Sequence, residues 1–222
     1  MSRMSSSVRV VSLILQDPFV QSLRTQLHMF PPSLGSDSHK GQAGRVAVIG
    51  GSKDYTGAPY YAAAASLRFG GDLSYVFCEK SASLAIKSYS PELMVSPLYV
   101  YEDLEGPQFP CNVLMDAVLG MLPRLHSLVV GPGMGRDTKV FAIVQSIIES
   151  AVEAGIPVVI DADGLYMLEA FSELWPVVLG HAKKVFITPN KAEFDRLCKR
   201  AAGSFLFFFA IGSSGNDGDD AT

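Results

Sequence analysis

The stretch RVAVIGGSKDYTGAPYYAAAASLRFGG, residues 45–71, decides the fold class of this chain. It opens with a short β-branched run, passes through a glycine-containing loop and continues into the Ala-rich segment Ala58–Phe69. A continuously apolar run is typical of a strand buried on both faces, and alanine favours helix. Gly70 and Gly71 then end the helix, because glycine accepts the left-handed conformation. The stretch therefore predicts one strand–loop–helix unit.

The same alternation recurs along the chain. The candidate strands share a short, nearly continuous apolar character, and they are Val46–Gly50, Leu73–Cys78, Leu128–Gly131, Pro157–Asp161 and Lys184–Thr188. The segment Thr138–Ala154 spaces its aliphatic residues for one apolar helical face. Strands alternating with helices predict an α/β fold, with a mostly parallel central sheet flanked by helices.

Composition limits the class of protein. With 222 residues, 48% hydrophobic and 18% charged, the chain has enough apolar material for one substantial core. A net charge of −4 argues against nucleic-acid or anionic-membrane partners, which require excess Lys and Arg. No apolar run approaches the roughly 20 residues of a membrane span. Cys78, Cys111 and Cys198 lack metal-ligand spacing, and we expect buried core thiols.

Both ends of the chain differ from its centre. Residues 1–39 form an N-terminal extension, and its first sixteen residues are basic and free of acid. That composition fits a weak organellar transit segment or a frayed surface helix, so we expect a mitochondrial or cytoplasmic protein. Residues 40–200 hold the predicted domain. Residues 201–222 are an aromatic run followed by a Gly/Ser/Asp tail, and the segment Glu102–Asn112 is a polar connection.

The carboxyl ends of the predicted strands are where ligands bind in parallel α/β sheets. After the first strand, Gly57 and Ala58 open a helix without side-chain bulk, which suits either a ligand-cradling loop or a tight turn. In VVGPGMGRD, Gly135 and its neighbouring glycines leave backbone amides exposed, as a phosphate nest or a structural turn would. The spacing differs from the G-x-G-x-x-G dinucleotide fingerprint, which disfavours a nicotinamide-dependent dehydrogenase.

Acidic and amide side chains follow the last two predicted strands. In VVIDADGLYML, Asp161 and Asp163 are placed to bind a ligand, and Asp163 is equally placed to cap the next helix. In FITPNKAEFDRL, Asn190 and Glu193 have the spacing of a capping box, or of ligand contacts. The residues alone leave both alternatives open.

Six segments follow one another along the chain: KGQAGRVAVIGGSKDYTGAPYYAA, LSYVFC, SYSPELMVSP, VVGPGMGRD, PVVIDADGLYML and ITPNKAEFDRL. Taken in this order, they resemble the eukaryotic ATP-dependent NAD(P)H-hydrate dehydratases, and the match covers roughly Lys40–Lys199. The resemblance implies a ribokinase-like fold, with substrate bound above the strand ends. It also implies a repair reaction, in which ATP and Mg²⁺ serve the dehydration of the S form of hydrated NADH or NADPH to NAD(P)H, releasing ADP and phosphate.

The resemblance also implies site residues. The residues expected to contact the hydrate are Gly135, Asn190, Lys191, Ala192, Glu193, Phe194, Asp195, Arg196 and Leu197. Gly57 and Ala58 would shape the loop over the nicotinamide, Asp161 and Asp163 would line the cleft, and no side chain binds metal directly, although Glu193 would order metal-bound water. The implied partners are the small-molecule substrate, a further copy of the chain, and a functional link to an NAD(P)H-hydrate epimerase.

The sequence departs from the family pattern after Arg200. The family continues with a lysine-glycine turn and a Gly-x-Gly-Asp loop whose aspartate is the catalytic base, and IGSSGND, residues 211–217, resembles that loop only superficially. We therefore expect a C-terminally truncated chain that lacks the last strands and ATP loop, exposes an apolar sheet edge and is inactive alone.

Two alternative functions remain open on these residues. A small-molecule kinase of the same superfamily would leave a phosphorylated product instead of free phosphate and NADH. A noncatalytic isoform would bind nucleotide, or a full-length subunit, without turnover.

Overall fold

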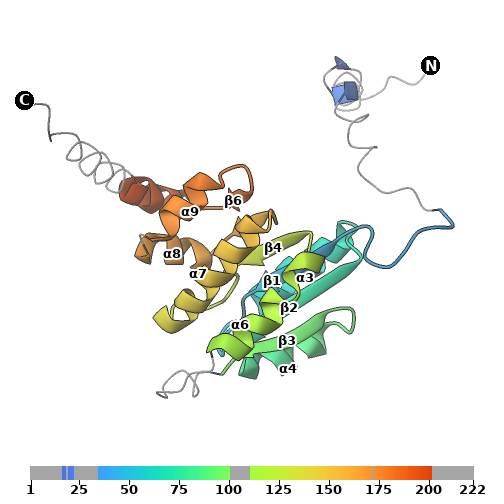
Figure 1. The fold of residues 1–222 in the computed structure, drawn as a ribbon, viewed down its shortest axis with the longest axis horizontal. Helices are drawn as coiled ribbons and strands as arrows, with labels where there is room; N and C mark the ends of the chain where they lie inside the picture. Colours follow the sequence, from blue (N-terminus) through green and yellow to red (C-terminus); the bar gives the residue numbers. More distant parts are fainter. Residues whose placement is uncertain (1–16, 19, 23–34, 101–110, 172, 202–222) are drawn as a thin grey trace, which may run out of the picture. The chain divides into compact units, whose positions relative to one another are not determined.

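The computed structural model describes residues 17–18, 20–22, 35–100, 111–171 and 173–201 (Figure 1). Residues up to Ala43 and the body from Gly44 onward are two separate units, and each is described by itself. In the first unit, residues 36–37 and 40–43 form turns. The expected transit segment, the tail after Ala201 and most of the polar connection at residues 102–112 lie outside the described residues.

The body from Gly44 is built on a six-stranded sheet in which every pairing is parallel. Its strands are β1 (Arg45–Ile49), β2 (Leu73–Glu79), β3 (Met94–Tyr99), β4 (Ser127–Val130), β5 (Val158–Ile160) and β6 (Val185–Ile187). Their order in the sheet is β3-β2-β1-β4-β5-β6. Figure 1 shows β3 toward the lower edge of the body and β6 toward its upper edge. The predicted α/β class with a parallel sheet is confirmed, and each of the five predicted strands is present.

Strand β3 was not among the predicted strands. Its sequence MVSPLY contains Ser96 and Pro97, both exposed, which breaks the continuous apolar pattern. Proline cannot donate to a strand ladder and is tolerated at a sheet edge. Among the described strands β3 lies at that edge and pairs only with β2, so Pro97 is placed where its missing N–H costs little.

Helices connect the strands. They are α3 (Gly57–Arg68), α4 (Lys80–Tyr89), α6 (Cys111–Leu119), α7 (Thr138–Glu153), α8 (Asp163–Ala170) and α9 (Leu174–Gly180), with a short 3-10 turn at Leu122–Arg124 and a further helix over residues 191–201. The two helices predicted from the sequence match α3 and α7 to within a residue. The predicted connection through Asn112 was too long, because α6 already begins at Cys111.

Alternate side chains of β1 enter two different cores. Ala47 and Ile49 belong to the larger apolar cluster, with side chains of α6, α7, α8 and α9. Val48 belongs to the smaller cluster, with side chains of α3 and α4. Successive strand residues point to opposite faces, so a strand covered on both sides must be apolar throughout. This explains why the run VAVI was readable from the sequence.

Not every cysteine is buried in the core. Cys78 on β2 is fully buried, as expected, and burial together with the nearby Glu79 raises the pKa of its thiol to about 12. The expectation was wrong for Cys198, which is exposed, because it lies on the outer side of helix 191–201 next to the inward-facing Leu197. The side chain of Cys111 lies outside the described residues. Across the described segments, no helix is long and apolar enough to cross a membrane.

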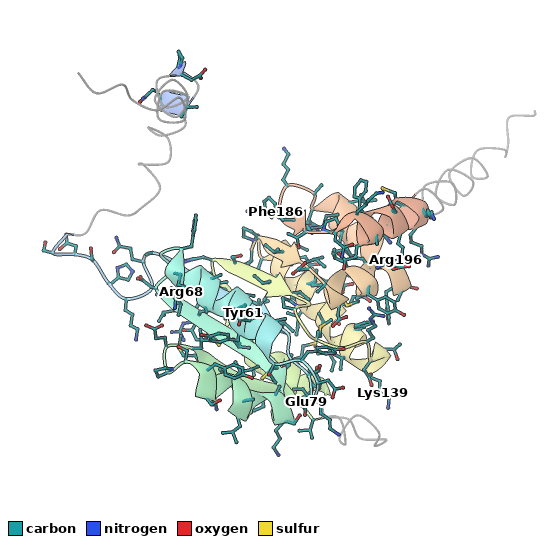
Figure 2. All side chains as sticks on the ribbon, turned by 180° about the vertical axis from the view of Figure 1, so that it is seen from behind. Tyr61, Arg68, Glu79, Lys139, Phe186 and Arg196 are labelled. Carbon is teal, nitrogen blue, oxygen red and sulfur yellow. The ribbon has the colours of Figure 1, made fainter. Side chains whose placement is uncertain are left out.

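Strand β6 forms the other edge of the described sheet and carries exposed apolar side chains. Phe186 is 55% and Ile187 is 39% exposed, and Phe194 on the following helix is also exposed. Figure 2 labels Phe186 at this edge. Such an open edge of a parallel sheet is a template for further pairing. Among the described strands, β6 is therefore an edge that carries exposed apolar side chains.

Candidate functional site

An open cleft of about 740 Å³ lies at the carboxyl ends of three adjacent strands, β1, β4 and β5. Each strand leads into a loop and then a helix, so the three loops meet at the same edge of the sheet. The cleft is lined by Ser52, Lys53, Asp54, Tyr55, Ala58, Gly133, Gly135, Arg136, Ala162 and Asp163. A volume of this size lies within the range of small-molecule sites.

The loop after β1 is held by its own backbone. Gly51 N donates to Pro132 O of the neighbouring loop at 3.1 Å. Within the loop, the backbone amides of Ser52 and Tyr55 each donate to the other's carbonyl oxygen, both at 3.1 Å. Ser52 is 5% exposed, whereas Tyr55 is 60% exposed beside the cleft.

The backbone of the loop after β4 depends on glycine. Gly131 has φ +116°, and a Cβ there would lie 1.9 Å from the carbonyl oxygen of Asp161. Gly135 has φ +84°, a region that L side chains rarely adopt. The loop then ends at Asp137, whose carboxylate accepts hydrogen bonds from the first turn of α7. Glycine therefore brings the β4 and β5 loops into direct contact.

Asp163 joins these two loops. Its Oδ2 accepts a hydrogen bond from Gly135 N at 3.0 Å, and Arg136 Nε donates to its Oδ1 at 3.4 Å. The Arg136 guanidinium also lies over the Tyr166 ring, 4.3 Å from its centroid. The capping alternative for Asp163 was wrong: α8 begins at Asp163 itself and its N-cap is Ala162, which makes no side-chain cap bond.

The other residues predicted to line the cleft at the strand ends do not all do so. Asp161 Oδ1 accepts a hydrogen bond from Thr188 Oγ1 at 2.7 Å, which joins the ends of β5 and β6, and Asp161 is not among the cleft-lining residues. Ala58 lines the cleft, while Gly57 begins α3 directly beside it. The structure thus brings together Ala58, Gly135 and Asp163.

The stretch after β6 forms a capping box. Asn190 N donates to a Glu193 carboxylate oxygen at 2.8 Å, and Glu193 N donates to Asn190 Oδ1 at 3.0 Å. This reciprocal pair confirms the capping alternative for both residues.

None of residues 190–197 lines the cleft. Lys191, Ala192, Phe194, Asp195 and Arg196 are exposed, and Arg196 pairs with Glu169 at 3.0 Å. Leu197 is 4% exposed and belongs to the larger core, so its side chain stabilises the helix against the body.

The cleft also contains residues that the sequence analysis did not single out. Ser52, Lys53, Asp54 and Tyr55 come from the loop after β1, and Arg136 from the loop after β4. These residues lie next to the glycines of the predicted loops, and that position was the sequence feature that could have identified them.

A metal ion held by protein ligands alone has no evident place in the described segments, where no three His, Cys, Asp or Glu side chains gather. Mg²⁺ bound together with a nucleotide needs only one or two carboxylates, since phosphates and water supply its other ligands. The exposed Asp54 at the rim of the cleft is compatible with that smaller requirement.

Comparison with known proteins decides the family. Residues 46–213 match the family model described as NAD(P)H-hydrate dehydratase. The chain belongs to the NAD(P)H-hydrate dehydratase family. The resemblance recognised from the ordered motifs is therefore confirmed, and the cleft loops lie within the matched residues.

Curated relatives agree with this assignment. The chain is 44% identical over 183 residues to the ATP-dependent (S)-NAD(P)H-hydrate dehydratase of Schizosaccharomyces pombe, covering 82% of this chain and 55% of the relative. It is 47% identical over 166 residues to the human protein of the same name, covering 75% of this chain and 44% of the relative. The chain spans about half the length of the curated relatives it matches.

A solved structure shows the same fold. A ribokinase-like superfamily protein from Enterococcus faecalis V583 matches with a TM-score of 0.57 and 23% identity, covering 74% of this chain and 51% of that one. The ribokinase-like architecture expected from the sequence is confirmed.

Proposed function

We propose that this chain takes part in the ATP-dependent dehydration of the S form of hydrated NADH or NADPH, which restores NAD(P)H and releases ADP and phosphate. The observation that carries the proposal is the convergence of the YTGAP, GPGMGRD and DADGL motifs on one cleft, joined by the bonds of Asp163 to Gly135 and Arg136. The curated relatives named above for this reaction support it.

The cleft has groups suited to a hydrated dinucleotide. Lys53 and Arg136 supply positive charge toward its phosphates, and the guanidinium is oriented by both Asp163 and Tyr166. Tyr55 offers an exposed aromatic ring for stacking, and the small Ala58 leaves room at the start of α3. In this proposal the nicotinamide half of the substrate lies between the loops after β1 and β4.

The chemistry explains why the reaction uses ATP. Hydroxide is a poor leaving group, whereas phosphate is a good one. Transfer of the γ-phosphoryl group forms an oxygen–phosphorus bond at the ring hydroxyl, which loses its proton, and breaks the bond between the γ-phosphorus and the oxygen that leaves with ADP. A nucleotide-bound Mg²⁺ would neutralise part of the phosphate charge. The carbon–oxygen bond then breaks with its electron pair going to phosphate, helped by the ring-nitrogen lone pair. A proton lost from the adjacent carbon completes the double bond.

The test has a turnover arm and a binding arm. In the first, the purified chain is mixed with NADH hydrate, ATP and Mg²⁺, and the return of NADH absorbance is followed against a control without ATP. In the second, the hydrate alone is titrated into the chain by calorimetry. ATP-dependent return of NADH supports the whole proposal, and binding without turnover supports only the substrate side.

Two outcomes contradict the proposal. A phosphorylated product that accumulates without NADH indicates a small-molecule kinase. Absence of both binding and turnover rules out this cleft as a hydrate site in the chain.

A further inference from the structure

Thr56 and Tyr89 are joined by a hydrogen bond between their hydroxyl groups. Thr56 Oγ1 and Tyr89 Oη are 2.8 Å apart, although the residues are separated by 33 positions in the chain. Thr56 is the N-cap of α3, yet its side chain makes no capping bond to that helix. A threonine at this position normally caps its own helix. Here the hydroxyl instead ties the start of α3 to Tyr89, the last residue of α4.

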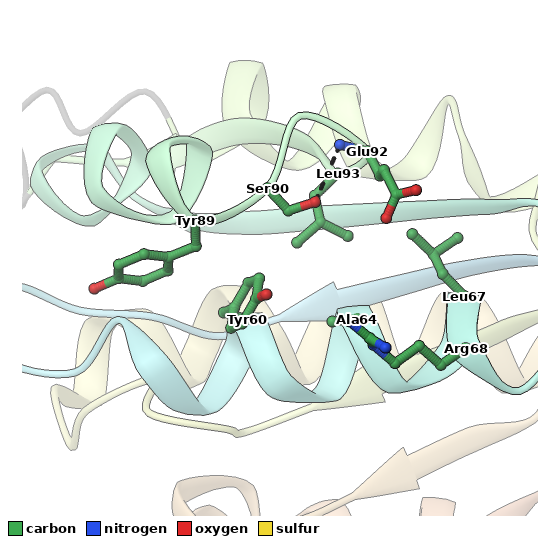
Figure 3. Close-up of a pocket in the computed structure, with 8 residues that line it drawn as sticks. All are labelled: Tyr60, Ala64, Leu67, Arg68, Tyr89, Ser90, Glu92 and Leu93. Atoms are coloured by element: carbon green, nitrogen blue, oxygen red, sulfur yellow. Dashed lines mark hydrogen bonds between the residues drawn. The ribbon is translucent and has the colours of Figure 1, made fainter.

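The Tyr89 ring is itself held in place. It packs edge-on against Tyr60 of α3, with ring centroids 5.2 Å apart and an interplanar angle of 66°. Figure 3 shows the two rings next to each other at one end of a groove between α3 and the segment after α4. In that segment Ser90 Oγ accepts a hydrogen bond from Glu92 N, and Leu93 is 7% exposed. The contacts of the YSPEL motif, residues 89–93, therefore hold the Tyr89 hydroxyl in position.

We propose that Tyr89 is a positioning residue for the candidate cleft, acting through Thr56 on the loop that runs from Ser52 to Thr56. The inference rests on the proposed function, because its consequence is measured as hydrate binding. The start of the loop is fixed by the bond from Gly51 N to Pro132 O. The Thr56–Tyr89 bond supplies a tether at its other end. Between these two points lie Lys53, Asp54 and Tyr55, which line the cleft.

Two substitutions break this tether from opposite sides. Thr56→Val keeps the side-chain shape and removes the hydroxyl, and Tyr89→Phe removes the phenol while keeping the ring against Tyr60. Either change releases the same bond, so the double variant should bind no more weakly than the weaker single variant. Each is expected to raise the Kd for NADH hydrate about 3- to 10-fold, the range that one neutral hydrogen bond provides.

The experiment combines calorimetric titration with NADH hydrate and hydrogen exchange of the ligand-free full chain. The expected result is faster amide exchange in the peptide covering residues 52–57 of both single variants, with unchanged exchange in α7. Tyr61→Phe is the matched control for Tyr89→Phe, since Tyr61 lies on α3, next to Tyr60, is 72% exposed and loses the same chemical group. It should change neither measurement.

The two arms separate the two proposals. If the wild-type chain does not bind the hydrate, the proposed function fails, while loop exchange still decides whether the tether exists. Unchanged exchange at residues 52–57 in both variants overturns the positioning role of Tyr89. Additive losses of affinity in the double variant overturn it as well, and so does a uniform rise in exchange across the body, which indicates only a structural role.

Discussion

The carboxylate of Asp163 accepts a hydrogen bond from the backbone amide of Gly135 across 28 residues of sequence, and the donor–acceptor distance is 3.0 Å. The bond joins the first turn of α8 to the loop after β4. It also holds a carboxylate beside Arg136, whose side chain is 63% exposed at the cleft. Asp163 therefore both lines the cleft and holds two of its loops together.

Asp163→Asn should therefore weaken the cleft and destabilise the body. The amide keeps an acceptor for Gly135 N and loses the negative charge that orients Arg136. Hydrogen bonds to charged groups contribute about 1.5–3 kcal/mol, so we expect the free energy of unfolding to fall by ~1–2 kcal/mol. We also expect the affinity for the hydrate to fall about tenfold. Urea unfolding and calorimetry measure both. Asp116→Asn, an equal charge change at an exposed position of α6, should alter neither.

Gly131→Ala should be severely destabilising. A Cβ at this position would lie 1.9 Å from the Asp161 carbonyl oxygen and 2.4 Å from Gly164 N, both of which are backbone atoms. The β4 and β5 loops would have to separate, and we expect a loss of more than ~3 kcal/mol in the free energy of unfolding.

Gly70→Ala is the matched control for that variant. Gly70 has φ +114°, close to the φ +116° of Gly131, but nothing lies within 4 Å of its added Cβ. Gly70→Ala therefore introduces backbone strain without a steric clash, and such strain costs about 1–3 kcal/mol. Equal losses in the two variants would show that strain, and not the contact between loops, requires glycine at residue 131.

Because of Cys78, the free energy of unfolding should depend on pH in the alkaline range. Burial, and secondarily Glu79, raises the pKa of its thiol from 9.0 to about 12 in the folded state. Between these values the unfolded chain releases a proton that the folded chain retains, so the contribution of Cys78 is present below pH 9.0 and is lost as pH rises toward 12.

Urea unfolding across this alkaline range measures the effect. The slope contributed by Cys78 is at most ~1.4 kcal/mol per pH unit. Cys78→Ala should be less stable at neutral pH, because it leaves a cavity, and its stability should fall less steeply with pH. Cys198→Ala, at the exposed thiol, should keep the wild-type slope. Parallel slopes in all three proteins would contradict the assignment to Cys78.

The apolar edge at β6 should promote self-association. Phe186→Lys places a charge on the edge strand, a common way in which proteins prevent edge pairing. We expect less light scattering and a smaller hydrodynamic radius at high concentration. Phe69→Lys removes a 97% exposed phenylalanine that lies away from the edge, at the end of α3. Equal improvement in both variants would indicate general surface hydrophobicity instead of edge pairing.

The sequence by itself determined the strands that are buried on both faces and the helices with a complete apolar stripe. Strands β1, β2, β4 and β5 were readable because a strand between two helical layers must be apolar at every position. Strand β6 was readable from its apolar run alone, since Phe186 and Ile187 are exposed at the sheet edge. Helix α7 was readable because its buried residues recur with helical spacing. The capping box of Asn190 and Glu193 was readable because both partners lie within one helical turn.

Only the tertiary structure decided the features that depend on distant partners. Asp163 had the local spacing of a cap, and its bond to Gly135 arises because β4 and β5 are neighbours in the sheet. The Thr56–Tyr89 bond depends likewise on α3 packing beside α4, and Pro97 is acceptable because β3 lies at an edge. Local periodicity determines which face of an element is buried, whereas the order of the strands determines which side chains meet.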